Sequence, residues 1–228
     1  IINLINPELS GVAYSISQFP DGELHFSFMK PLDHKKKYCV KCRITNGNDL
    51  FIVVQVGNIL NRCGVEWTLD IFYLMSMRMD RVISFLEPFS LEIVANILNS
   101  LHVSEVRILH PHSDRTFKLI NNSKNMEGLT FPIFENILES HDYIICYPDS
   151  GARNRYNANL SCYTNYSIIE CTKQRNSILG FVEKVSCNNP EIPENIPIIV
   201  VDDLCDGGGT FIRVAEKLKE LYPNNPLH

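Results

Sequence analysis

The sequence predicts an α/β protein, in which parallel strands alternate with helices along the chain. Short apolar runs recur along its 228 residues, as expected for strands that are covered on both faces of a sheet. Between these runs, residues 88–101 and 209–222 space their apolar side chains at helical intervals. The runs that we interpret as strands are 51–56, 69–74, 106–109, 143–147, 167–171 and 198–201.

The alternation of strands and helices divides into two similar halves, each predicted to be a largely parallel sheet flanked by helices. A stretch rich in Asn and Ser, 120–128, is typical of a loop near the division. We therefore predict one domain at 1–125 and a second at 126–228. Because Ile1 is not an initiator residue and the chain stops where a helix should lead into the next strand, we expect residues to be missing at both ends, with the second domain incomplete.

Composition restricts the classes of protein that this chain can represent. An apolar content of 45% is typical of a globular chain, and a net charge of -5 offers no general attraction to nucleic acid. No apolar run approaches the roughly 20 residues that cross a bilayer, and no secretion signal precedes the first strand, so we expect a cytoplasmic protein without a membrane partner. Several of the eight cysteines lie inside apolar runs, which favours a reducing compartment.

The strongest chemical signal is the segment 198–210, in which an apolar strand runs through acids and glycines into a helix. Three consecutive glycines let the main chain approach an anion at a helix N-terminus, and a following threonine adds a hydroxyl donor. Two adjacent carboxylates can accept hydrogen bonds from sugar hydroxyls or bind a divalent cation. The pattern predicts a ribose-phosphate site, formed by Asp202, Asp203, Asp206, Gly207, Gly208, Gly209 and Thr210.

This segment resembles the phosphoribosyl pyrophosphate (PRPP) motif that is shared by type I phosphoribosyltransferases and ribose-phosphate pyrophosphokinases. Other segments separate the two classes. F-P-D-G-E at 19–23, R-M-D-R at 78–81, H-P-H-S-D at 110–114, Y-P-D-S-G at 147–151 and K-Q-R at 173–175 are similar to pyrophosphokinase motifs and occur in the family's order. The resemblance covers nearly the whole chain and favours the pyrophosphokinases.

The resemblance also implies roles for individual residues. The residues implied to bind ATP are Phe19, Asp21, Glu23, Arg78, Asp80 and Arg81. In the family the first of these segments reaches the ATP site of a neighbouring subunit, so a homo-oligomer is implied. The implied ligands of Mg²⁺ are His112 and Asp149, and the implied catalytic cations, which would stabilise the transferring phosphoryl group, are Lys173 and Arg175.

The sequence departs from the family pattern at four places. His110 stands where the family usually has Asp, and Gln174 replaces the middle Arg of its K-R-R segment. The glycine loop is D-G-G-G-T instead of the more usual D-T-A-G-T. The interval between Val56 and Trp67 is expected to be too short for the long helix of the family's first domain.

The activity that the resemblance implies is transfer of the β,γ-pyrophosphate of ATP to the C1 hydroxyl of ribose 5-phosphate, with Mg²⁺, giving PRPP and AMP. Three alternatives stay open. Some relatives with a similar D-G-G-G-T-F segment carry out this chemistry on ADP-ribose in NAD salvage. A phosphoribosyltransferase would explain 201–210 but not 19–23 or 78–81. A regulatory paralogue would keep the ligand pocket and lack turnover.

Overall fold

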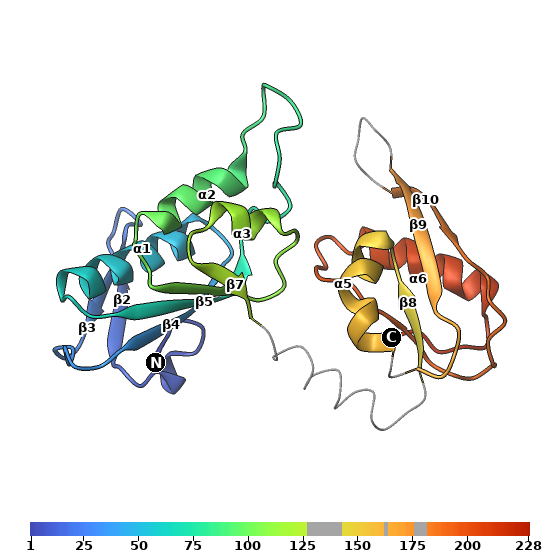
Figure 1. Ribbon diagram of the computed structural model, residues 1–228, viewed down its shortest axis with the longest axis horizontal. Helices are drawn as coiled ribbons and strands as arrows, with labels where there is room; N and C mark the ends of the chain where they lie inside the picture. The colour runs from blue at the N-terminus through green and yellow to red at the C-terminus, as the bar shows by residue number, and fades with distance from the viewer. Residues whose placement is uncertain (127–142, 162–163, 176–181) are drawn as a thin grey trace. The chain divides into compact units, whose positions relative to one another are not determined.

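The computed structural model describes residues 1–126, 143–161, 164–175 and 182–228. The chain forms two compact units, Ile1–Leu129 and Thr130–His228, so the boundary that we predicted lies a few residues before the division. Each unit contains a largely parallel sheet flanked by helices, which confirms the predicted α/β class (Figure 1). Within the described ranges, none of the helices combines the length and the apolar character needed to cross a membrane.

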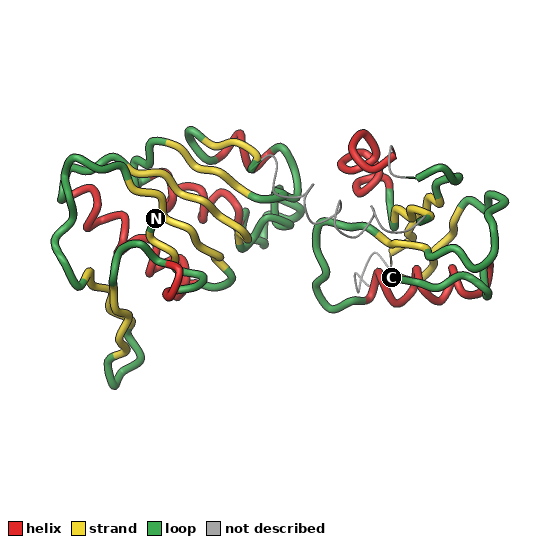
Figure 2. The backbone as a smooth tube through the Cα atoms, turned by 90° about the horizontal axis from the view of Figure 1, so that it is seen from below, coloured by secondary structure: helices red, strands yellow, loops and turns green. Residues whose placement is uncertain are grey.

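Unit 1 contains a five-stranded sheet in the order β1-β4-β5-β6-β7, in which every pair is parallel. Its helices α1, α2 and α3 lie on one face of the sheet (Figure 1). The β2–β3 hairpin forms a separate sheet and projects from the unit (Figure 2). The elements are β1 (Ile2–Asn3), η1 (Pro7–Leu9), β2 (Tyr14–Gln18), β3 (Leu24–Phe28), β4 (Tyr38–Ile44), α1 (Gly47–Arg62), β5 (Trp67–Leu74), α2 (Ser90–Asn99), β6 (Glu105–Ile108), α3 (Arg115–Leu119) and β7 (Ser123–Asn125).

Unit 2 contains a four-stranded sheet in the order β10-β9-β8-β11. Strands β9, β8 and β11 are parallel, and β10 is antiparallel to β9. Alternate residues of β8 enter two different cores: Ile144 packs with Val214 of α6, whereas Ile145 packs with Ala152 of α5. The two helices therefore cover opposite faces of the sheet. The elements are β8 (Ile144–Tyr147), α5 (Ser150–Leu160), β9 (Ile169–Arg175), β10 (Val182–Cys187), β11 (Ile198–Val200) and α6 (Gly209–Leu221).

One predicted strand is wrong. Residues 51–56 belong to α1, whose buried residues Ile52, Val53, Val56 and Leu60 follow helical spacing against the sheet. A short, continuously apolar run does not distinguish a buried strand from a buried helix. Helix α1 runs from Gly47 to Arg62, so a 16-residue helix is present because it begins before the interval between Val56 and Trp67 that we considered too short. The prediction further missed the strands β1 to β4 and β10, and β7 lies inside the stretch that we interpreted as a loop.

Two cysteines differ from the expectation of reduced thiols. Cys171 and Cys187 face each other across the antiparallel pair of β9 and β10 and are joined by a disulfide. Directly opposed positions in such a pair bring side chains together. Other cysteines are free, including Cys39 and Cys42 of the C-x-x-C segment. In the described part of the chain, His, Cys, Asp and Glu side chains do not converge in threes on a metal position.

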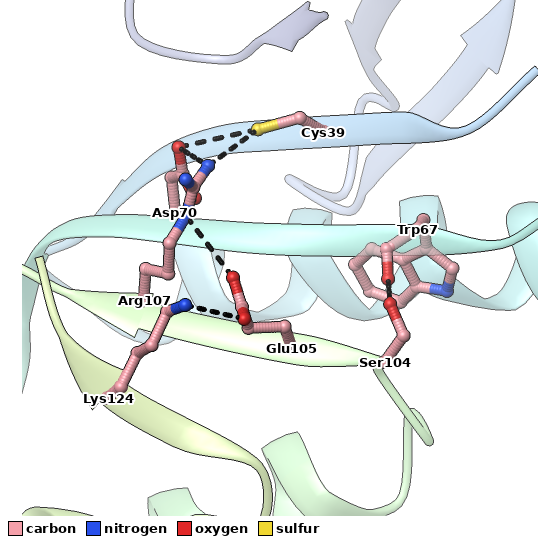
Figure 3. Close-up of polar contacts among 7 residues, drawn as sticks. All are labelled: Cys39, Trp67, Asp70, Ser104, Glu105, Arg107 and Lys124. Carbon is pink, nitrogen blue, oxygen red and sulfur yellow. Dashed lines mark hydrogen bonds and ion pairs between the residues drawn. The ribbon is translucent and has the colours of Figure 1, made fainter.

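A charged network covers the face of the unit 1 sheet that is opposite to the helices (Figure 3). Asp70 of β5 is buried, and its two carboxylate oxygens accept hydrogen bonds from Nε and Nη2 of Arg107 at 2.6 and 2.7 Å. Lys124 pairs with Glu105 at 2.7 Å on the same face. The Asp70 side chain is 6% exposed, so its charge depends on Arg107 for compensation.

We expect Arg107→Met to lower the free energy of unfolding of unit 1 by roughly 2 to 4 kcal/mol, because it leaves a buried carboxylate without its cation. Trp67, the one tryptophan of the chain, is buried in unit 1, so its fluorescence during urea unfolding reports on this unit. Lys124→Met is the control, since its ion pair is more exposed and should contribute at most about 1 kcal/mol. Equal effects of the two substitutions would contradict this account.

Candidate functional site

In unit 1, the segments 78–81 and 110–114 lie at one edge of the sheet. They follow β5 and β6, which are adjacent parallel strands, and the carboxyl ends of such strands share an edge where ligands of α/β proteins bind. The hydroxyl of Ser113 donates to Asp80 Oδ2 at 2.7 Å, and Arg115 donates to the Asp80 carbonyl at 3.0 Å. The structure thus brings the predicted ATP residue Asp80 together with the segment that contains His112.

Asp80 is buried and already hydrogen-bonded within the protein. Arg81 Nε donates to its Oδ1 at 2.8 Å, and this hydrogen bond is the main reason that the pKa of Asp80 lies below its usual value. Arg78 and Arg81 are exposed, whereas His112 is half-buried. His110, where the family has Asp, adopts a positive φ of 46°. Asp80 therefore ties the loop after β5 to the loop after β6 and orients Arg81, in addition to any contact with a nucleotide.

Phe19, Asp21 and Glu23 lie at the exposed tip of the β2–β3 hairpin. The tip is a tight turn, in which the N–H of Gly22 donates to the carbonyl of Phe19 at 2.8 Å. Gly22 has a φ of +93°, a conformation that favours glycine. Phe19 is 52% exposed. The hairpin that contains these three residues forms its own sheet, which is separate from the sheet of β5 and β6.

In unit 2, Asp149 and Lys173 form an ion pair. Asp149 follows β8, Lys173 lies on the adjacent parallel strand β9, and the Lys173 Nζ is 2.6 Å from Asp149 Oδ2. Asp149 also caps α5, because its Oδ1 accepts a hydrogen bond from the N–H of Ala152 at 2.9 Å. Burial would raise the pKa of Asp149, but the hydrogen bonds from Lys173 and from the backbone hold it below its usual value.

Asp202 and Asp203 follow β11, the other neighbour of β8, so they lie at the same edge of the sheet as Asp149 and Lys173. The N–H of Asp203 donates to Asp202 Oδ1 at 2.9 Å. Burial, and then the neighbouring Asp203 carboxyl, raise the pKa of Asp202 to about 6. Two carboxyls in contact oppose each other's ionisation, so this pair needs a cation for both members to be charged.

Sequence reasoning missed that cation, Arg155 of α5. Its Nη1 lies 2.7 Å from Asp203 Oδ2, and the Asp203 side chain is only 8% exposed. The sequence shows an arginine after the Y-P-D-S-G segment. It does not show which residue this arginine pairs with, because the pairing depends on how α5 packs against the end of β11.

The glycine loop leads into α6, which begins at Gly209. Gly208 precedes the helix with a φ of +74°, so a glycine is favoured there by the backbone itself. A Cβ on Gly207 or Gly209 would meet no atom of the described residues within 4 Å. The space beside these two glycines is therefore open for a ligand. Asp206 and Thr210 flank this space, with Asp206 exposed and Thr210 half-buried. The side chain of Arg175, the other predicted catalytic cation, lies outside the described part of the chain.

Several known proteins are similar to this chain over most of its length. Ribose-phosphate pyrophosphokinases from Buchnera aphidicola and Haemophilus ducreyi are 27% and 26% identical to this chain over 216 and 220 residues, which is 90% of the chain. The crystal structure of phosphoribosylpyrophosphate synthetase from Mycobacterium smegmatis matches 95% of the chain and 71% of its own chain, with a TM-score of 0.72 and 16% identity. The chain resembles the ribose-phosphate pyrophosphokinases.

The similarity to the pyrophosphokinases extends over most of this chain but not over all of theirs. The chain spans 66% of the length of the two curated relatives named above and 62% of the pyrophosphokinase of Mycoplasma pneumoniae. No protein-family model matches the sequence. The predicted resemblance is confirmed, and the predicted pyrophosphokinase roles of individual residues remain predictions.

The raised pKa of Asp202 predicts a dependence of stability on pH. Its folded-state pKa of about 6 exceeds the ordinary value of about 3.9, so its stabilising contribution is present below pH 4 and is lost as the pH rises through about 6. Asn cannot ionise and can still accept the N–H of Asp203. Asp202→Asn should therefore gain about 1 to 2 kcal/mol over the wild type between pH 4 and 7, allowing for partial exposure.

Urea unfolding that is followed by circular dichroism at several pH values checks this prediction. Glu220→Gln, at an exposed acid of α6, is the control and should follow the wild type. If Asp202→Asn and the wild type show the same pH dependence, Asp202 does not carry a raised pKa.

Proposed function

We propose that the protein is a Mg-ATP-dependent ribose-phosphate pyrophosphokinase, which transfers the β,γ-pyrophosphate of ATP to the C1 hydroxyl of ribose 5-phosphate and releases PRPP and AMP. The observation that carries the proposal is the arrangement in unit 2. Lys173 lies on β9, Asp149 follows β8, and the acid pair and the open glycine loop follow β11; these three strands are parallel neighbours. Similarity to pyrophosphokinases over 90% of the chain supports the same activity.

The acceptor would lie between the acid pair and the start of α6. The N–H groups at the N-terminus of a helix attract a phosphate, and the open space beside Gly207 and Gly209 allows a phosphate to approach the main chain. Asp202 and Asp203 supply carboxylate oxygens for the ribose hydroxyls. Carboxylates repel a phosphate anion, so in this proposal the two acids contact the sugar and the glycine loop contacts the phosphate.

The nucleotide would be bound by the loop after β5. Arg78 and Arg81 are exposed, and guanidinium groups match the geometry of phosphate oxygens. Asp80 fixes Arg81 through its hydrogen bond at 2.8 Å, so this arginine needs little ordering when ATP binds. We assign the exposed hairpin residues Phe19, Asp21 and Glu23 to the ATP site of a neighbouring subunit, which makes the protein a homo-oligomer.

The donor groups of the site suit Mg²⁺, which prefers oxygen ligands. Asp149 Oδ2 already forms an ion pair with the ammonium group of Lys173 at 2.6 Å, so a cation can approach this oxygen. Asp149 would supply a carboxylate ligand from unit 2, and His112 of unit 1 stays a predicted ligand. The ion would supply positive charge to the phosphates of ATP. Lys173, which pairs with Asp149 in this structure, would contact the transferring group.

In the reaction, the C1 oxygen of the sugar attacks the β-phosphorus of ATP. The bond between this phosphorus and the α,β-bridging oxygen breaks, AMP leaves with that oxygen, and the proton of the hydroxyl is released to water. Lys173 and Arg175 supply positive charge to the phosphoryl oxygens, where charge is spread in the transition state. Correct alignment of acceptor and donor supplies much of the remaining acceleration.

A second acceptor, ADP-ribose, is favoured by one observation. A methyl group on Gly207 or Gly209 would meet no described atom within 4 Å, so the loop leaves room for a phosphate that carries a substituent. Ribose 5-phosphate has a terminal phosphate, whereas the corresponding phosphate of ADP-ribose is linked to a second phosphate. Both acceptors have the C1 hydroxyl that the chemistry requires.

Release of AMP from Mg-ATP tests the proposed function. The wild type should release AMP when ribose 5-phosphate or ADP-ribose is added, and the acceptor with the higher kcat/KM identifies the substrate. Lys173→Met should lower kcat by about 100-fold or more, because it removes a cation that acts on the transition state. Lys184→Met, at an exposed lysine of the neighbouring strand β10, is the control and should retain activity.

Three results would contradict the proposal in different ways. Absence of AMP with either acceptor would favour a regulatory protein that binds ligands without turnover. Consumption of PRPP with a nucleobase, independent of ATP, would identify a phosphoribosyltransferase. Full activity of Lys173→Met would remove Lys173 from the catalytic residues.

A further inference from the structure

Arg155 lies beside the acid pair, and neither the sequence motifs nor the function proposed above gives it a part. It belongs to α5, the helix that Asp149 caps. Its Nη1 is 2.7 Å from Asp203 Oδ2, with side chains that are 23% and 8% exposed. An ion pair with one nearly buried carboxylate is screened little by solvent, so removal of the cation would leave an uncompensated charge.

The guanidinium of Arg155 is also held from a second side. It lies 5.9 Å from the ring centroid of Tyr156, within the range of a cation–π interaction. The Tyr156 side chain is buried and packs in the small core that contains Tyr147 and Val201. Burial raises the pKa of Tyr156 to about 12, so the ring next to Arg155 stays uncharged at neutral pH. The cation is therefore held against a buried part of unit 2.

The two members of the acid pair differ in their surroundings. Asp203 faces Arg155, whereas Asp202 accepts the N–H of Asp203 at 2.9 Å. Adjacent carboxylates that are both ionised repel each other unless a cation compensates one of them. Sugar hydroxyls donate hydrogen bonds more strongly to an ionised carboxylate than to a neutral carboxyl. The capacity of the pair to bind a sugar therefore depends on a cation at Asp203.

We propose that Arg155 is a positioning residue for the sugar-phosphate acceptor: it holds Asp203 ionised and fixed, so that both acids can accept hydrogen bonds from the ribose hydroxyls. Arg155 acts through Asp203 and contacts no reacting atom. The inference rests on the proposed function only for the identity of the acceptor. It assigns a separate role to α5, which joins the acid pair to the Asp149–Lys173 ion pair at the start of the same helix.

Equilibrium binding of ribose 5-phosphate to Arg155→Met tests this inference without requiring turnover. We expect affinity to fall about tenfold or more, as for loss of hydrogen bonding by a charged group, whereas affinity for Mg-ATP should change less than about twofold. Arg155→Lys keeps the charge and should recover part of the loss. The matched control is Arg153→Met on the same helix, whose ion pair with Glu170, at 2.8 Å and with side chains 48% and 40% exposed, does not involve the acid pair.

Isothermal calorimetry gives these affinities, and circular dichroism checks that each variant is folded. Selective loss of ribose 5-phosphate affinity in Arg155→Met, with partial recovery in Arg155→Lys, supports the assignment. The assignment is overturned if Arg155→Met binds ribose 5-phosphate as tightly as the wild type does, or if its affinity for Mg-ATP falls to the same extent. It is also overturned if Arg153→Met loses as much affinity for ribose 5-phosphate, or if the wild type does not bind ribose 5-phosphate. AMP release by the wild type reports separately on the proposed activity, so failure of one proposal is distinguishable from failure of the other.

Discussion

Parallel pairing of β8 with both of its neighbours is the constraint on which the candidate site of unit 2 depends. In this arrangement the carboxyl ends of β9, β8 and β11 share one edge. Lys173, Asp149 and the acid pair are far apart in the sequence, yet each lies on or just after one of these strands. A change in strand order would separate them, whereas substitutions elsewhere in the sheet would leave the edge intact.

Charge compensation organises the same edge. Lys173 pairs with Asp149, and Arg155 pairs with Asp203, so the carboxylates that ligands would meet are compensated within the protein. Burial raises the pKa of the remaining acid, Asp202, to about 6, which costs stability at neutral pH. Functional sites commonly retain such unfavourable groups because ligand binding uses them. Unit 1 shows the contrasting case, in which the buried carboxylate of Asp70 and the guanidinium of Arg107 satisfy each other.

The sequence predicted features that short-range chemistry determines. The α/β class, the strand before Asp202 and helix α6 could all be predicted, because apolar runs, acids and glycines occur together in one continuous segment. The assignment of 51–56 to a strand was wrong. A short run of apolar residues has the same appearance in the sequence whether it forms a buried strand or a buried part of a helix.

Long-range contacts could not be predicted in the same way. Arg155 meets Asp203, and Ser113 meets Asp80, only after helices and strands have packed. Nothing in the local sequence of α5 distinguishes Arg155 from Arg153, although one faces the acid pair and the other faces Glu170. The burial of Asp80 could likewise not be predicted from the sequence, because a carboxylate between two arginines in a loop is typical of an exposed position.

The central claim is that this site transfers a diphosphate group intact to the C1 oxygen of a sugar phosphate. The most direct test is phosphorus NMR of the products formed by the protein with Mg-ATP and ribose 5-phosphate or ADP-ribose. The account predicts AMP in equal amount to a product whose two coupled phosphorus signals report a diphosphate on C1. A product with a single new phosphate, accompanied by ADP, would show transfer of the γ-phosphate alone and would contradict the account.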